Sequence, residues 1–124
     1  MESDSLFDKG CHFFDSAEFF EAHEAWEDLW NDAQGARHAY LQCLIQVAVA
    51  MHHAGNENWA GTRKLLASSL SYLEKGRSAA VEVDLNALKD HVLDFELALQ
   101  ARLAGGPPEN QGPLPFIKLP LIKH

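Results

Sequence analysis

The chain has 124 residues, 47% of them apolar and 23% charged, which is enough for one globular domain with its own core. Its 10 Lys and Arg against 18 Asp and Glu give a formal net charge of −8. This balance counts against nucleic acid and anionic membranes as partners, because both attract cationic protein surfaces. The sequence has no signal-peptide pattern and no apolar stretch long enough to span a bilayer, so we expect a cytoplasmic protein.

Proline divides the sequence into two parts. The first 104 residues contain none, and all five prolines lie in the last 18. Because proline cannot continue a regular helix, we predict one helical-bundle domain over residues 1–106 and a Pro-rich, extended tail over residues 107–124. The tail is too apolar for a solvated linker. We expect it to pack on its own bundle or on a second subunit.

Hydrophobic periodicity and capping signals predict five helices and no strand, hence a compact all-α bundle. The helices are expected over about residues 4–14, 17–32, 36–54, 58–75 and 85–104. Asp15 or Ser16 is the expected cap of the second helix, and Asp84 that of the fifth. The third helix is apolar almost all round, so it is expected at the centre of the bundle, covered by the others.

The second helix carries the candidate site. At about 100° per residue, His23 and Glu27 fall among aromatic positions that include Trp26 and Trp30, with Glu24 at the rim. A carboxylate on an apolar face is costly unless it is paired, hydrogen-bonded or bound to a cation. The i, i+4 spacing lets both side chains reach one point, as half of a metal site or as a carboxylate that orients an imidazole base. His23, Glu27 and Glu24 are therefore the candidate catalytic residues.

The third helix offers a narrow polar stripe that consists of Gln42, Gln46 and His53. If this stripe faces the second helix, a polar pocket lies between the two helices, lined by the stripe and by Trp26 and Trp30. His53 would then join His23 and Glu27 as a third metal ligand, and the set would suit Zn²⁺, Fe²⁺ or Mn²⁺. Gln46 would lie in the second coordination shell or orient a substrate.

Two alternatives remain open at this point. The polar stripe could be the solvent-facing edge of the third helix, with His52 beside it as a bystander. His23 and Glu27 could be a buried structural pair that holds helices together in a non-catalytic interaction or scaffold module. The residues therefore leave open whether the protein is an enzyme, and no residue set identifies a substrate class.

Two blocks of the sequence resemble the domain of unknown function family 309, a group of small helical bacterial and archaeal proteins. The family motif HxxxExx(W/Y) is matched by His23, Glu27 and Trp30. The second block is matched by Gln46, His53, Asn58 and Gly61, and the resemblance runs from about Leu6 to Leu73. It implies an all-helical bundle and a metal-binding or hydrolase-like site at the motif, without a known substrate. One departure is Glu57, where the family tends to carry Gly.

The apolar content also predicts assembly. The third helix needs cover on every side, and the tail adds six large apolar residues after the last helix. Four surrounding helices, one of them short, are not expected to shield all of this surface. Because contiguous exposed apolar patches mark interfaces, and two-fold dimers are the commonest oligomers, we expect a homodimer.

Overall fold

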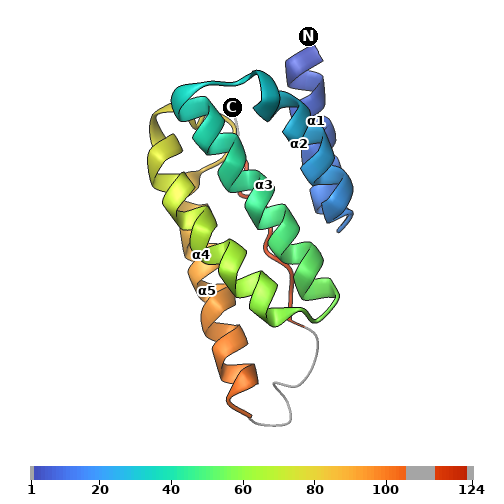
Figure 1. Cartoon of the computed structure of the whole chain (residues 1–124), viewed down its shortest axis with the longest axis vertical. Helices are drawn as coiled ribbons and strands as arrows, with labels where there is room; N and C mark the ends of the chain where they lie inside the picture. The colour runs from blue at the N-terminus through green and yellow to red at the C-terminus, as the bar shows by residue number, and fades with distance from the viewer. Residues whose placement is uncertain (1, 106–113, 123–124) are drawn as a thin grey trace.

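The computed structural model describes residues 2–105 and 114–122, and within them the chain is all-helical (Figure 1). In chain order the elements are α1 (Glu2–Asp15), α2 (Phe19–Asp32), α3 (Gly35–Gly55), α4 (Trp59–Gly76), the short 3-10 helix η1 (Arg77–Ala79) and α5 (Leu85–Leu103). The predicted all-α fold is confirmed, and each helix begins and ends within two residues of its expected position. None of the described helices is long and apolar enough to cross a membrane.

Helix α3 lies in the middle of the bundle (Figure 1). The pair α1 and α2 packs on one side of it and α4 on the other, while α5 packs mainly against α4. The largest fully buried side chains come from four of the five helices and from the loop before α5, and they include Trp26, Tyr40, Leu44, Leu66 and Leu99. The core is therefore continuous through the bundle.

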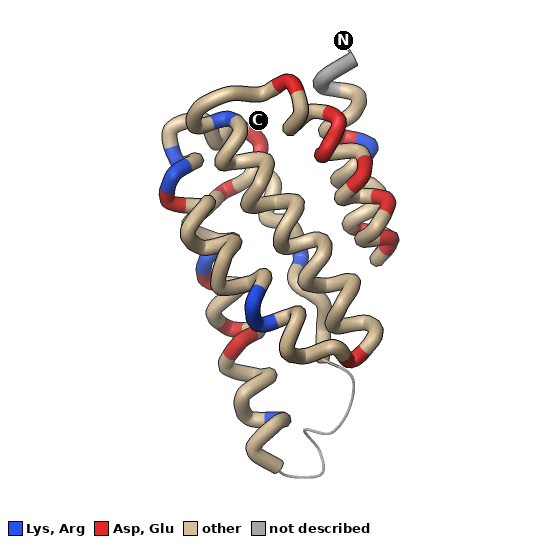
Figure 2. Tube along the Cα trace, in the orientation of Figure 1, with Lys and Arg blue, Asp and Glu red and all other residues tan. Residues whose placement is uncertain are grey.

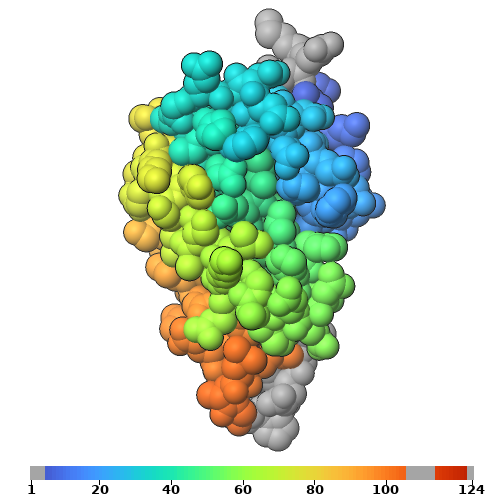
Figure 3. All heavy atoms as spheres, viewed as in Figure 1, coloured from blue at the N-terminus to red at the C-terminus, as the bar shows by residue number. Residues whose placement is uncertain are grey.

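One edge of α3 is less covered than the sequence suggested. Gln42, Gln46, Val49 and His53 are half-buried and recur at spacings of three and four, whereas most other side chains between Ala39 and Ala54 are buried. Figure 3 shows α3 reaching the surface between α2 and α4. The expectation that α3 is covered on every side is thus wrong along this edge, and the polar stripe coincides with it.

Two glycines allow helices to approach closely. A Cβ built on Gly10 of α1 would lie 2.3 Å from Nε1 of Trp26 in α2. A Cβ on Gly76, at the end of α4, would lie 2.5 Å from the backbone nitrogen of Tyr40 in α3. Neither position has room for a side chain, so these two residues set the spacing of α1 against α2 and of α4 against α3.

A half-buried ion pair joins the start of α3 to the loop before α5. The Arg37 guanidinium donates to both carboxylate oxygens of Glu82, at 2.7 and 2.8 Å, and lies 5.2 Å from the centre of the Tyr40 ring. The Tyr40 hydroxyl accepts a hydrogen bond from the backbone N–H of Val83 at 3.0 Å. These contacts hold the loop against the end of the bundle where α3 begins.

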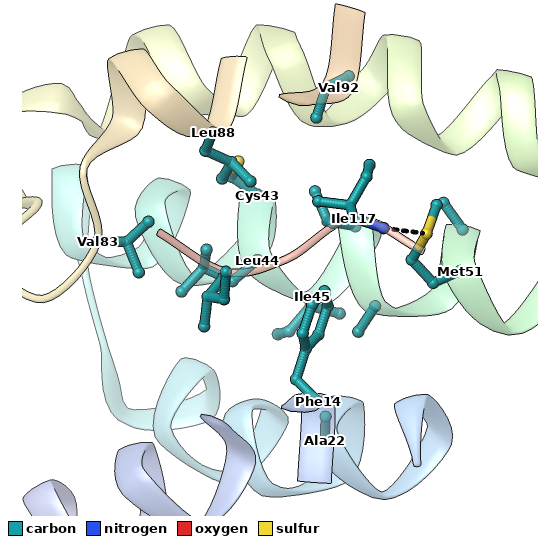
Figure 4. Packing of buried hydrophobic residues seen from close by; sticks show 14 of the residues in the cluster. Phe14, Ala22, Cys43, Leu44, Ile45, Met51, Val83, Leu88, Val92 and Ile117 are labelled. Carbon is teal, nitrogen blue, oxygen red and sulfur yellow. Dashed lines mark hydrogen bonds between the residues drawn. The ribbon is translucent and has the colours of Figure 1, made fainter. Parts of the chain in front are cut away.

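The described part of the tail, residues 114–122, is extended and packs on its own chain. Ile117 and Leu119 are buried, and the Ile117 N–H donates to Sδ of Met51 at 3.4 Å (Figure 4). At its far end the Ile122 N–H donates to the carbonyl of Glu82 at 2.8 Å. Residues 107–113 and 123–124 of the predicted tail lie outside the described residues.

The turns after α1 and α3 both contain a left-handed residue other than glycine. Ala17 has φ 59° and Glu57 has φ 58°. In the first turn the Glu18 N–H donates to the carbonyl of Phe13 at 2.8 Å, which closes the end of α1. The expected cap of α2 by Asp15 or Ser16 is therefore wrong, because both residues belong to the end of α1 and its turn. The expected cap at Asp84 is present, with its carboxylate accepting from the Ala87 N–H.

We predict that Glu57→Gly stabilises the fold. A left-handed conformation is strained for any residue with a Cβ, and the relief should exceed the entropy that glycine adds to the unfolded chain. The expected gain in the free energy of unfolding is about 0.5–1 kcal/mol, measured by urea denaturation. Equal or lower stability of the variant would contradict the strain at this turn.

Glu82 should make stability depend on pH. Burial raises the pKa of Glu82, but the hydrogen bonds and charge of Arg37, with the hydrogen bond from Tyr40, outweigh burial and leave that pKa below its ordinary value of 4.5. The contribution is therefore complete above pH 4.5 and is lost as the pH falls through the lower folded value. Glu82→Gln should cost about 1–3 kcal/mol at neutral pH, and denaturation curves at several pH values should show this difference shrinking in acid.

The homodimer stays a prediction, and the structure suggests where to test it. Leu93, Leu97 and Leu103 are exposed on α5, and Leu93 and Leu97 are one turn apart on the same face. Light scattering at micromolar concentration should give the mass of two chains, and the double substitution Leu93→Lys, Leu97→Lys should give that of one. A full-length monomer at this concentration would refute the dimer.

Candidate functional site

His23 and Glu27 are hydrogen-bonded to each other on α2. Nε2 of His23 donates to Oε2 of Glu27 at 2.9 Å, and Nδ1 of the same ring lies 3.2 Å from the carbonyl oxygen of Phe20. Both oxygens are acceptors, so the two contacts are hydrogen bonds at the same time only when the ring carries both protons. Both nitrogens of His23 thus face an oxygen atom of its own helix.

The pair is not buried, contrary to the sequence interpretation. The side chains of His23 and Glu27 are 20% and 50% exposed. With Phe19 at 0°, the buried positions Ala22, Ala25 and Trp26 lie at about 300°, 240° and 340°, and Glu27 lies at about 80°. The aromatic residues suggested a face centred on His23, but the buried Ala22 and Ala25 mark the true packing side.

Aromatic and imidazole rings connect α2 to α3 beside this pair. The Phe20 ring is 5.3 Å from the His23 ring and 5.9 Å from the His52 ring, measured between centroids. Near the other end of α2, the rings of Trp30 and His38 are 4.3 Å apart. We call this surface the α2–α3 edge and define it by Phe20, His23, Glu27, Trp30, His38 and His52.

His53 does not join His23 and Glu27. Its Nδ1 lies 3.3 Å from Nδ2 of Asn58, and a Cβ on Gly61 would lie 3.1 Å from its ring, so it faces the turn into α4. Neighbouring residues on a helix point about 100° apart, and it is His52 that points toward α2. Within the described part of the chain, no three His, Cys, Asp or Glu side chains are grouped so that they could hold a metal ion.

The predicted pocket residues are divided between the core and the surface. Trp26 is fully buried, and its Nε1–H donates to the carbonyl of Phe7 at 3.2 Å, so it holds α2 against α1 and lines no pocket beside His23. Trp30 is half-buried, as are Gln42 and Gln46. Oε1 of Gln46 and Nε1 of Trp30 are buried atoms without a hydrogen-bond partner among the described residues.

Glu24 lies on another side of α2. It lines a hollow of 390 Å³ between α1 and α2 together with Lys9 and with other acidic residues of α2, namely Glu21, Glu27 and Asp28. Figure 2 shows acidic positions following one another along this part of the molecule. The chain thus presents Glu24 as part of an acidic surface, and Glu27 borders both this surface and the α2–α3 edge.

The two cysteines supply no nucleophile. Burial raises the pKa of the Cys43 thiol to about 12, and burial together with the nearby carboxylates, Asp8 first, raises that of Cys11 to about 12. Both residues are buried. At neutral pH they stay protonated and act as small apolar side chains of the core.

Sequence reasoning missed two contributors to this surface, His52 and His38. The signal was present in the helical wheel of α3, on which both residues lie at about 120–160° with Tyr40 at zero, on the side that faces α2. The polar stripe that was predicted to face α2, namely Gln42, Gln46 and His53, lies on the neighbouring sector of the helix. Ring contacts between helices depend on how the helices are rotated against one another, which periodicity does not report.

Comparisons with known proteins find a family and a curated protein that are similar to the part of the chain that holds the motif. Residues 7–65 match the family described as domain of unknown function (DUF309). An uncharacterized protein of Bacillus subtilis (strain 168), YpuF, is 33% identical over 75 residues, which cover 60% of this chain and 43% of YpuF. The chain thus aligns with less than half the length of that curated relative. No solved structure matches.

Proposed function

We propose that this chain, whose residues 7–65 match the DUF309 family, is a non-catalytic helical binding module. Its contact surface in this proposal is the α2–α3 edge. The partner is another protein, which covers Phe20 and the rings beside it. The His23–Glu27 hydrogen bond serves to hold the surface of α2 in shape.

The exposure of Phe20 carries this proposal. Its side chain is 49% exposed although its ring contacts rings on two helices, so a large apolar group is held in place at the surface. Aromatic residues held in this way serve as anchors in protein interfaces, since they bury much area at little cost in conformational entropy. The rings of His23 and His52 give the anchor a polar surround.

The hydrogen bonds of His23 support the non-catalytic interpretation. A general base needs a free nitrogen lone pair that faces a substrate, and here Nε2 faces Glu27 while Nδ1 faces the carbonyl of Phe20. Because the pair is partly exposed, breaking it should cost little. We expect His23→Ala and Glu27→Ala each to lower the free energy of unfolding by about 1 kcal/mol or less, rather than by the several kcal/mol of a buried pair.

The binding test compares three immobilised proteins: the wild type, Phe20→Ala and the control Val81→Ala, which removes an exposed apolar side chain outside the α2–α3 edge. A protein retained from a lysate of the source cells is identified by mass spectrometry, purified and titrated against each of the three. Phe20→Ala should weaken binding about tenfold or more, whereas Val81→Ala should not. Equal binding by Phe20→Ala and the wild type, or no purified protein that binds, would refute the proposal.

A divalent metal ion at His23 and Glu27 is the second candidate. The 2.9 Å between Nε2 and Oε2 favours it, because two ligand atoms with bonds of about 2.0–2.2 Å to one ion lie only slightly farther apart, at roughly 3–3.4 Å. The pair is accessible, so an ion and its water molecules could reach it. A hydrolase-like activity would depend on this ion.

The metal is tested by melting temperature and calorimetry with Zn²⁺ and Mn²⁺ on protein without a histidine tag. His12→Ala is the matched control, since His12 is exposed and lies outside the motif. We expect wild type and His12→Ala to bind the ion and gain thermal stability, and His23→Ala to do neither. The same response from His23→Ala and wild type would rule out this ion site.

A further inference from the structure

A hollow of 330 Å³ lies between α5 and the extended C-terminal segment, and none of the residues that define the α2–α3 edge lines it. Its lining is mainly apolar and includes Phe95, Ala98, Leu114, Pro115, Phe116 and Ile117. Its volume is at the lower end of the range for small-molecule sites, and the combination of apolar walls with a few polar groups is typical of them. Neither the family motif nor the proposed binding surface involves this hollow.

The polar groups of the hollow are His91, Asp94 and Lys118. Nδ1 of His91 lies 3.0 Å from the backbone carbonyl of Lys118, so the imidazole also holds the C-terminal segment to α5. The Lys118 side chain is exposed, and it takes part in none of the ion pairs found among residues 2–105 and 114–122. Lys118 thus adds a cationic residue to the lining of a mainly apolar hollow.

A second hollow adjoins the first. It has a volume of 310 Å³, reaches the turn between α3 and α4, and shares Leu114 and Phe116 with the first hollow as lining residues. The Phe116 side chain is partly exposed and stands between the two spaces. A long, narrow ligand that outgrew the first hollow would reach the second by displacing the Phe116 side chain.

We propose that the hollow binds a linear fatty carboxylate, with the alkyl chain against Phe95, Ala98 and Phe116 and the carboxylate at Lys118. The alkyl chain supplies the favourable free energy by leaving water. The ammonium of Lys118 selects an anionic head group. The net charge of −8 opposes an anion only weakly at this site, because charges beyond about 8 Å are screened at physiological ionic strength.

Asp94 gives the proposal a charge test of its own. Its carboxylate lines the same hollow and repels the ligand head, whereas Lys118 attracts it. Asp94→Asn should therefore strengthen the binding of decanoate, and Lys118→Ala should weaken it. Neither change should alter the binding of decanol, which has the same alkyl chain without the charge.

The experiment is calorimetric titration of the full chain with octanoate, decanoate and dodecanoate below their micellar concentrations. Affinity should rise about fourfold per added methylene until the hollow is filled. Ala98→Trp places a large ring in the hollow from an exposed helix position and should abolish binding. Ala101→Trp adds the same ring one turn along α5, at an exposed residue outside the lining, and should bind as the wild type does.

Three results would overturn the proposal. The first is no binding of any of the three carboxylates, and the second is binding that does not depend on chain length. The third is equal binding by Ala98→Trp and Ala101→Trp. Light scattering on the same samples identifies the competing occupant: if the wild type is a dimer, Ala98→Trp is a monomer and decanoate does not bind, then a second copy of the chain covers the hollow. None of these outcomes depends on the α2–α3 edge, so each proposal can fail alone.

Discussion

The contact of Arg37 with Glu82 is the constraint on which the arrangement of the C-terminal half depends. It connects the first turn of α3 to the loop that carries the chain into α5, and Tyr40 and Val83 continue it into the core. The same Glu82 supplies the backbone carbonyl that accepts from Ile122. Glu82 thus fixes both the loop before α5 and the end of the extended segment, and helix periodicity encodes neither of these contacts.

The helices were predictable because their signals are local. Periodicity, the absence of proline before residue 107 and the Asp84 cap depend on a few neighbouring residues, and all agree with the structure. The left-handed turn at Ala17 was not predictable, since alanine is not a usual residue there. The packing side of α2 was misjudged because Ala22 and Ala25 contribute little to the hydrophobic pattern, yet both are buried.

The sequence predicted correctly that His23 and Glu27 pair, but it did not predict how exposed the pair is or which side chains surround it. The i, i+4 spacing places His23 within reach of Glu27 whatever surrounds the helix, and their hydrogen bond is present. Whether that pair is buried, and whether His52 or His53 stands near it, depends on how α2 and α3 are rotated against each other. Side chains far apart in the sequence decide that rotation, so a single helix cannot reveal it.

The extended segment also bears on the order of folding. Ile117 fills part of the core beside Met51, a residue 66 positions earlier, and its neighbours pair with the loop before α5. During synthesis, α1 to α4 leave the ribosome well before this segment does. Until the segment docks, part of their apolar surface stays uncovered. Docking is slow because closing so long a loop costs conformational entropy. The nascent bundle therefore stays open to aggregation and to chaperones until Ile117 docks.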